Sequence, residues 1–246
     1  MIAVLASVRD MAEAHEAAAA GADLVDLKEP SAGALGALAL EDIAAITMDI
    51  RSRWPRQPVS ATIGDFDPQD HAGRCAMARE VAACGVDYVK VGIAPGAHAA
   101  AALAHLAALR LPSVVIVFLA DGGIDLRLAE QAATLGFAGL MVDTADKSSG
   151  SLLAKADPDA LRAFVMLARR HGRLCGIAGS LGFDDVNQLR QLAPDYAGFR
   201  GALCDGDRRG RLDPARVRRL CALLRGEGVA TRDCPGKTSS PAPRSG

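Results

Sequence analysis

An acidic and a basic side chain interrupt an apolar run in the segment GADLVDLKEP (residues 21–30), where Asp26 and Lys28 lie two residues apart. Lysine is scarce in this chain, because only five of its 28 basic residues are lysine and the rest are arginine. Arginine stays protonated and forms no imine, whereas a lysine amine with a lowered pKa attacks carbonyl carbons. A lysine retained at the end of an apolar segment is therefore a candidate for covalent chemistry with a carbonyl substrate.

Two further apolar segments also end on charged residues. The segment DYVKVG (87–92) carries Lys90, and GLMVDTADK (139–147) carries Asp143 and Lys147. Alternation along a β-strand points Lys90 and Asp143 to the same face as the first pair, and Lys147 follows in the next loop. Clustered ammonium groups lower one another's pKa, which frees an amine to attack a carbonyl carbon at neutral pH. The five residues together predict Schiff-base chemistry, in which the carboxylates hold the lysines and carry protons.

A set of structural ion pairs is the alternative explanation for these charges. A single Asp–Lys pair would fit a structural role as well as a functional one. Five charged groups from three separate segments fit it less well, because burying them costs more free energy than apolar packing does. We therefore favour a functional site, where such clusters with shifted pKa values are typically found.

Short β-like runs alternate with Ala- and Leu-rich helical runs along the chain, which predicts an α/β protein. Eight such runs with helical crossovers predict a single (β/α)8 TIM barrel over residues 1–225, with its active site at the carboxyl ends of the strands. A doubly wound sheet is the alternative, but the sequence has no dinucleotide-binding fingerprint. The expected strands are residues 2–7, 24–28, 59–64, 88–92, 113–119, 139–144, 174–179 and 196–201.

Two loops rich in small residues follow the seventh and eighth expected strands. In TIM barrels, backbone amides at these two positions commonly hold a phosphate group. A third such loop, EPSAGALGAL (29–38), either holds a second anion or covers the mouth of the barrel. The expected phosphate-binding residues are Gly179 and Ser180 at the end of the seventh strand, and Arg200, Gly201 and Ala202 at the end of the eighth.

The composition argues against several other classes of function. The net charge of −1, the dispersed arginines and the aromatic content of 4% disfavour nucleic acid as a partner. The chain has no apolar stretch of about 18 uncharged residues and no basic leader, so we expect a cytoplasmic protein that does not bind membranes. Its six cysteines and five histidines show no metal-binding spacing, so no metal site is predicted.

The end of the chain changes character. Residues 226–246 are rich in Pro, Gly and Ser and contain few apolar side chains, which predicts a disordered tail. The sequence does not fix the oligomeric state, although the Ala- and Leu-rich helices would allow a homo-oligomer to form.

The sequence resembles the (5-formylfuran-3-yl)methyl phosphate synthases, also called 4-(hydroxymethyl)-2-furancarboxaldehyde-phosphate synthases, of methanofuran biosynthesis. The segments DLKEPSAGALGA and VDTADK carry the resemblance most specifically, and LASVRD, DYVKVG, GIAGSL and FRGALC extend it over nearly everything except the tail. The resemblance implies condensation of two molecules of glyceraldehyde 3-phosphate, with loss of phosphate and water and without a metal or organic cofactor.

The resemblance also implies roles for individual residues. Lys28 is the implied imine-forming residue and Lys90 the implied proton acceptor, with Asp26, Asp143 and Lys147 beside them. The residue types alone leave two other functions open. One is a class I aldolase that forms the same lysine imine with a different phosphosugar, and the other is a barrel that binds a phosphosugar without converting it.

Overall fold

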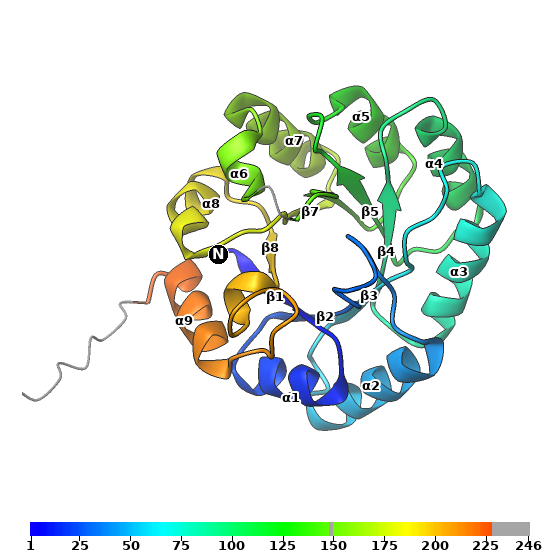
Figure 1. Cartoon of the computed structure of the whole chain (residues 1–246). Helices are drawn as coiled ribbons and strands as arrows, with labels where there is room; N and C mark the ends of the chain where they lie inside the picture. Colours follow the sequence, from blue (N-terminus) through cyan, green and yellow to red (C-terminus); the bar gives the residue numbers. More distant parts are fainter. Residues whose placement is uncertain (148–149, 228–246) are drawn as a thin grey trace, which may run out of the picture.

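The computed structural model describes residues 1–147 and 150–227, and within them the chain forms a closed barrel of eight parallel strands surrounded by helices (Figure 1). Each strand pairs with the next one along the chain, and β8 pairs back with β1. The strands are β1 (Ala3–Val8), β2 (Leu24–Leu27), β3 (Val59–Thr62), β4 (Tyr88–Ile93), β5 (Val114–Leu119), β6 (Gly139–Asp143), β7 (Leu174–Ile177) and β8 (Tyr196–Phe199).

Helices connect the strands on the outside of the barrel (Figure 1). Several of them begin at an aspartate whose carboxylate accepts a backbone N–H of the first turn, a favourable N-cap. The α-helices are α1 (Met11–Ala19), α2 (Leu40–Arg53), α3 (His71–Ala83), α4 (Ala99–Ala108), α5 (Leu126–Thr134), α6 (Leu152–Lys155), α7 (Pro158–Arg170), α8 (Val186–Leu192) and α9 (Pro214–Arg225), and the 3₁₀ turns are η1 (Phe183–Asp185) and η2 (Gly201–Leu203).

Alternate residues of each strand face either the helices or the interior of the barrel. Val25 and Leu27 of β2 are fully buried in the large apolar layer beneath the helices, so Asp26 between them points inward. A smaller apolar cluster fills the interior, and Leu35 joins it from the loop after β2. The Leu35 side chain lies so close to Gly92 of β4 that a Cβ there would come within 2.5 Å of it. The loop after β2 therefore plugs the middle of the barrel mouth.

The predicted TIM barrel is confirmed, and the alternative of an open doubly wound sheet is wrong. Several strands end one or two residues earlier than expected, as when β3 ends at Thr62 and β7 at Ile177. Gly64 and Gly179 follow these two strands with φ angles of 93° and 110°, which turn the chain out of the sheet.

Two features of the described residues concern the outer parts of the chain. None of the helices in residues 1–147 and 150–227 is long and apolar enough to cross a membrane. Of the predicted tail (226–246), Gly226 ends α9 in the left-handed conformation and Glu227 follows it. Residues 228–246 lie outside the described residues, so the prediction of a disordered tail stays a prediction.

Candidate active site

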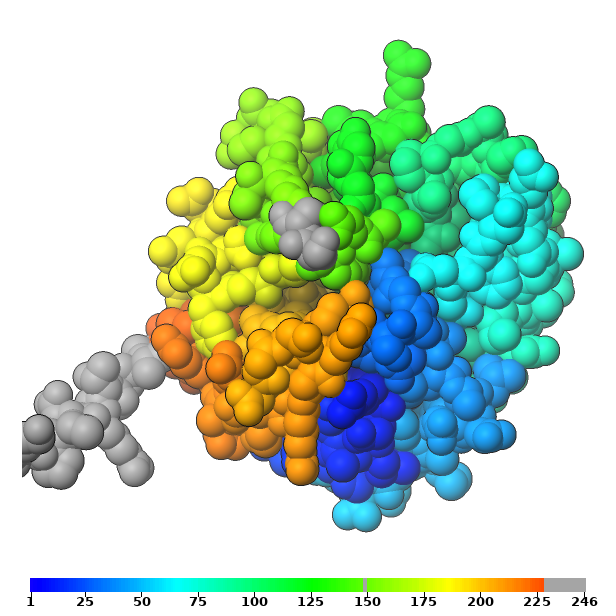
Figure 2. Space-filling view, viewed as in Figure 1, coloured from blue at the N-terminus to red at the C-terminus, as the bar shows by residue number. Residues whose placement is uncertain are grey.

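A cavity of about 350 Å³ opens at the carboxyl ends of the strands. Four of the five predicted charged residues line it, namely Lys28, Lys90, Asp143 and Lys147, and Asp26 is buried behind Lys90. On the face shown in Figure 2, the loops after β2, β6 and β8 (blue, green and orange) converge over the centre of the barrel. The structure thus brings together the groups that the strand alternation predicts on one face.

Asp26 and Lys90 form a buried ion pair at the bottom of the cavity. The Lys90 Nζ lies 2.8 Å from Asp26 Oδ2, and neither side chain is more than 4% exposed. The hydroxyl groups of Ser7 and Ser60 also donate to the Asp26 carboxylate, at 2.9 and 2.6 Å. Burial alone would raise the pKa of Asp26, but Lys90 and Lys28 outweigh it and hold this pKa below its ordinary value. Asp26 is therefore a fixed negative charge beneath the lysines.

Lys28 is the lysine of this cavity that no carboxylate neutralises directly. Its side chain is 5% exposed, and its Nζ donates to the carbonyl oxygen of Ala34 at 3.0 Å. Among the described residues no carboxylate oxygen lies within 4 Å of this amine, in contrast to Lys90 and Lys147. Burial lowers its pKa from 10.5 to about 8, although Asp143 opposes the shift. About a tenth of Lys28 is consequently a neutral amine at pH 7.

Asp143 and Lys147 form a second ion pair on the other side of the cavity. The backbone N–H of Thr144 also donates to Asp143 Oδ1, at 2.8 Å, and fixes the carboxylate at the end of β6. Burial lowers the pKa of Lys147, while Asp143 opposes that shift. The Ser180 hydroxyl donates to the backbone carbonyl of Lys147 at 3.0 Å, which links this pair to the loop after β7.

The loops after β7 and β8 line the cavity as expected for a phosphate site, through Gly179, Ser180, Gly201 and Ala202. Gly179 has a φ of 110°, and a Cβ there would lie 2.8 Å from Leu152 Cβ, so no other residue fits. Ser180 also has a positive φ, of 48°, which is strained for a residue with a Cβ. The backbone in this loop is thus turned toward the cavity at the cost of strain, as is common at ligand sites.

Arg200 also lines this cavity, but its guanidinium is engaged by other groups of the protein. Its guanidinium pairs with Glu13 of α1 and donates to the carbonyl oxygens of Ser7 (3.1 Å), Arg208 (2.9 Å) and Gly210 (2.9 Å). A further bond joins Nη2 to Glu13 Oε1 at 3.2 Å, so all five N–H donors face protein acceptors. The Arg200 side chain has no donor left for a phosphate and instead holds the loop after β8 in place.

Arg208 is a cavity residue that the sequence analysis missed. It lines the same cavity from the loop after β8, is half-buried, and donates to the carbonyl oxygen of Gly33 at 3.2 Å. Burial lowers its pKa against the attraction of Asp143, yet a guanidinium remains charged. The only signal in the sequence is the run GDRRGR (206–211), in which three arginines look alike. In the fold, the Arg200 guanidinium donates to the carbonyl oxygen of Arg208, and this contact fixes Arg208 at the cavity.

The described part of the chain contains no group of three or more His, Cys, Asp or Glu side chains arranged to hold a metal ion. The candidate site offers lysines and arginines, which are ligands for phosphate and partners for carbonyl groups. Such groups could hold a phosphate and react with a carbonyl carbon.

Comparison with other sequences gives a consistent set of relatives. A family model described as 4-HFC-P synthase matches residues 4–221. A Methylorubrum extorquens protein, named provisionally as a (5-formylfuran-3-yl)methyl phosphate synthase, is 41% identical over 223 residues, which cover 90% of this chain and 91% of that protein. The (5-formylfuran-3-yl)methyl phosphate synthase of Methanosarcina acetivorans is 36% identical over 237 residues, which cover 89% of this chain and 97% of that protein.

Among solved structures, phosphoribosyl anthranilate isomerase from Thermus thermophilus superimposes with a TM-score of 0.63 at 18% identity. The match covers 92% of this chain and 99% of the isomerase. At this identity the similarity extends to the barrel fold alone.

Proposed function

Because this chain belongs to the 4-HFC-P synthase family, we propose that it condenses two molecules of glyceraldehyde 3-phosphate into (5-formylfuran-3-yl)methyl phosphate through a Schiff base on Lys28. Atom balance requires that one phosphate and two water molecules leave. The observation that carries the proposal is the buried Lys28 amine, which has a pKa of about 8 and opens into a cavity flanked by two Asp–Lys pairs. The product would serve methanofuran biosynthesis, as the family resemblance implies.

The first step proposed for Lys28 is attack of its neutral amine on the carbonyl carbon of one triose phosphate. Loss of water then leaves an iminium ion, which makes the adjacent C–H group acidic. A base that removes this proton creates the carbon nucleophile needed to join the two trioses. We assign this proton transfer to Lys90, which accepts the proton as a neutral amine while Asp26 holds it in position, and we assign proton transfers at the opposite wall to Asp143 and Lys147.

The phosphate group of the imine-bound triose would lie at the loops after β7 and β8. Backbone groups of Ser180, Gly201 and Ala202 border the cavity there, and Arg208 supplies a guanidinium. Arg200 acts only through the loop that it holds. Fixing the phosphate in this way keeps the reacting carbon beside the lysines, which is the positioning that a carbon–carbon bond-forming step requires.

Incubation with glyceraldehyde 3-phosphate tests the proposal directly. We expect an ultraviolet-absorbing furaldehyde phosphate to form, in the presence as well as the absence of a metal chelator. Borohydride added during turnover should attach one triose phosphate to the peptide that contains Lys28. An adduct without any furan product would indicate a class I aldolase instead, and binding without either would indicate a phosphosugar-binding barrel.

A further inference from the structure

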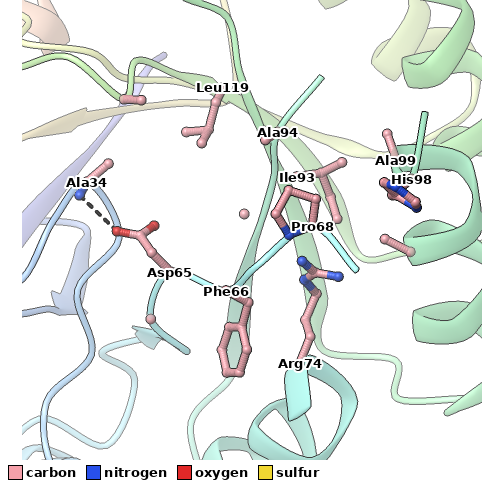
Figure 3. A pocket seen from close by; sticks show the side chains of 14 residues that line it. Ala34, Asp65, Phe66, Pro68, Arg74, Ile93, Ala94, His98, Ala99 and Leu119 are labelled. Carbon is pink, nitrogen blue, oxygen red and sulfur yellow. Dashed lines mark hydrogen bonds between the residues drawn. The ribbon is translucent and has the colours of Figure 1, made fainter. Parts of the chain in front are cut away.

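A second cavity, of about 320 Å³, opens beside the first at the carboxyl ends of β3, β4 and β5 (Figure 3). Parts of the loops after β2 and β6 lie between the two cavities. Ala34 lines the second cavity, while its carbonyl oxygen accepts the hydrogen bond from Lys28 on the other side. Ala145 also lines the second cavity and lies between Asp143 and Lys147 of the first. A ligand in the second cavity would thus lie across the loop after β2, with Ala34 and Leu35, from the lysines.

The second cavity contains a buried cation without a carboxylate partner. Arg74 lies on α3, lines this cavity and is only 4% exposed. Its Nη2 donates to the carbonyl oxygen of Asp67 at 3.0 Å, and its Nη1 lies 3.4 Å from His71 Nδ1. The guanidinium carbon is 6.0 Å from the centre of the Phe66 ring. Within the part of the chain that the structure describes, no carboxylate oxygen comes within 4 Å of Arg74.

The carboxylates of Asp70 and Asp67 attract Arg74 electrostatically, but neither forms a direct ion pair with it, because both bond to the backbone. Asp67 Oδ1 accepts the N–H of Gln69, and Asp70 Oδ1 accepts the N–H of Gly73 at the start of α3. An unpaired buried charge is strongly destabilising, and natural proteins seldom retain one without a ligand or a partner. Arg200, the other buried arginine near the barrel mouth, has Glu13 for this purpose. Arg74 therefore has no ion-pair partner among the described residues, and the cavity has room for an anionic ligand beside it.

The opposite wall of the second cavity carries a negative charge. Asp65 accepts the N–H of Ala34 at 3.1 Å, and its carboxylate is turned toward Ala34 and away from Arg74 (Figure 3). A phosphorylated ligand would therefore place its phosphate at Arg74, while its hydroxyl or carbonyl end would lie toward Asp65 and the loop after β2. This orientation brings the reactive end of the ligand nearest to Lys28.

We propose that the second cavity is a phosphate subsite, in which Arg74 binds the phosphate group of the second triose phosphate while the first is held on Lys28. The inference rests on the proposed function, because only a condensation of two phosphorylated trioses needs two phosphate sites. Joining the two carbons requires the loop that carries Ala34 to move, because this residue separates the cavities.

Binding of sn-glycerol 3-phosphate tests the subsite independently of catalysis, because this molecule has no carbonyl group and cannot form an imine. The test variants are Arg74→Gln, which removes the cation, and Ala94→Asp, which adds an anion to the cavity wall at an exposed position. Ala97→Asp is the matched control, since it adds the same charge to the same exposed loop without lining the cavity. Calorimetry should find two bound equivalents in the wild type and the control, and one in each test variant.

Kinetics with glyceraldehyde 3-phosphate then identifies the occupant. We expect both test variants to need a substrate concentration about tenfold higher or more for condensation, the loss typical of one charge-assisted phosphate contact. Borohydride trapping on Lys28 should keep its wild-type concentration dependence, since the first triose is bound elsewhere. Melting curves show whether each variant is folded. If Arg74→Gln unfolds, Ala94→Asp still tests the site, because it leaves the Arg74 contacts intact.

Two results would overturn the assignment. Ala94→Asp could bind two equivalents and condense the triose phosphate like Ala97→Asp, in which case the cavity is not a phosphate site. The variants could instead lose only their inhibition by inorganic phosphate, in which case the cavity holds the released phosphate and not the second substrate. If the wild type binds two equivalents but forms neither adduct nor furan, the proposed function fails while the phosphate subsite stands.

Discussion

Two clusters of buried charges lie at the same end of this barrel, and they are built differently. The guanidinium cluster consists of Arg200 and Glu13, and every N–H donor of the arginine has a protein acceptor. Both Glu13 oxygens accept hydrogen bonds, including one from the backbone of Leu212. The lysine cluster consists of Asp26, Lys28, Lys90, Asp143 and Lys147.

The difference between the clusters is a difference in balance. The guanidinium cluster pairs one buried cation with one buried anion and fixes the loop after β8. The lysine cluster has three cations for two anions, and Lys28 is the member whose amine reaches only a carbonyl oxygen. A balanced cluster fixes the local structure and is costly to break, whereas an unbalanced one keeps an amine near its neutral form and attracts phosphate. Substitutions in the two clusters should therefore affect different measurements.

The largest effect is expected for Lys28→Arg. A guanidinium keeps the positive charge but does not form an imine, so covalent catalysis is lost. We expect furan formation to fall by about 10³-fold or more, the combined loss of covalent and general-base assistance. The rate of furaldehyde formation measures the effect, and the melting temperature shows whether the variant is folded. A variant that retains more than about a tenth of the wild-type rate would contradict the Schiff-base role of this residue.

Arg200→Met should act on stability. Removing this guanidinium takes away the buried cation of Glu13 and leaves it only the half-exposed Arg9, whose Nε lies 3.5 Å from Glu13 Oε1. Breaking a buried pair in this way typically costs about 3–5 kcal/mol of unfolding free energy. Urea denaturation measures the loss, and the folded fraction should still form the borohydride adduct on Lys28. Wild-type stability combined with a large increase in KM would mean that Arg200 binds the phosphate after all.

The contrast between the clusters also shows what the sequence could predict. The lysine cluster was predictable because alternation along β2, β4 and β6 places its strand-end members on one face, with Lys147 in the loop that follows, and the barrel fold brings the ends of these strands together. The guanidinium cluster was not. Arg200 is separated from Glu13 by 187 residues, and no local pattern reveals which of two distant elements supplies the partner of a buried arginine.

The second cavity could not be predicted from the sequence for a similar reason. Arg74 occurs in the helical segment HAGRCAMARE, where an arginine ordinarily reaches the solvent. Its burial depends on how the segment between β3 and α3 folds back over the helix end and presents Phe66 and the carbonyl of Asp67. The same holds for Leu35, whose insertion into the barrel mouth follows from the path of a long loop and not from its composition.

A smaller effect, on substrate affinity, is expected for Arg208→Gln. The variant removes the guanidinium that lines the first cavity, and we expect KM for glyceraldehyde 3-phosphate to rise about 10- to 100-fold, the value of one charge-assisted contact. The melting temperature should change little, because this half-buried side chain makes a single hydrogen bond to Gly33. Arg209→Gln is the matched control, since Arg209 is the exposed neighbour of Arg208 and does not line the cavity. Equal KM values in the two variants would exclude Arg208 from phosphate binding.

The smallest effect, about tenfold per pH unit, is expected in the reactivity of Lys28 toward acetic anhydride, which modifies only neutral amines. Because burial lowers the pKa of Lys28 to about 8, acetylation should decline as the pH falls below 8 and level off above it. Lys155, an exposed lysine in the same sample, serves as the internal reference when peptides are quantified by mass spectrometry. Asp143 raises the pKa of Lys28, so Asp143→Asn should move the midpoint to lower pH. The lowered pKa of Lys28 also has a consequence for stability. The folded chain binds the Lys28 proton less tightly than the unfolded chain, whose ordinary pKa is 10.5, so the contribution of this residue to stability should rise between pH 8 and 10.5. Acetylation of Lys28 that rises in parallel with that of Lys155 up to pH 10 would show that the lysine cluster does not prepare a reactive amine.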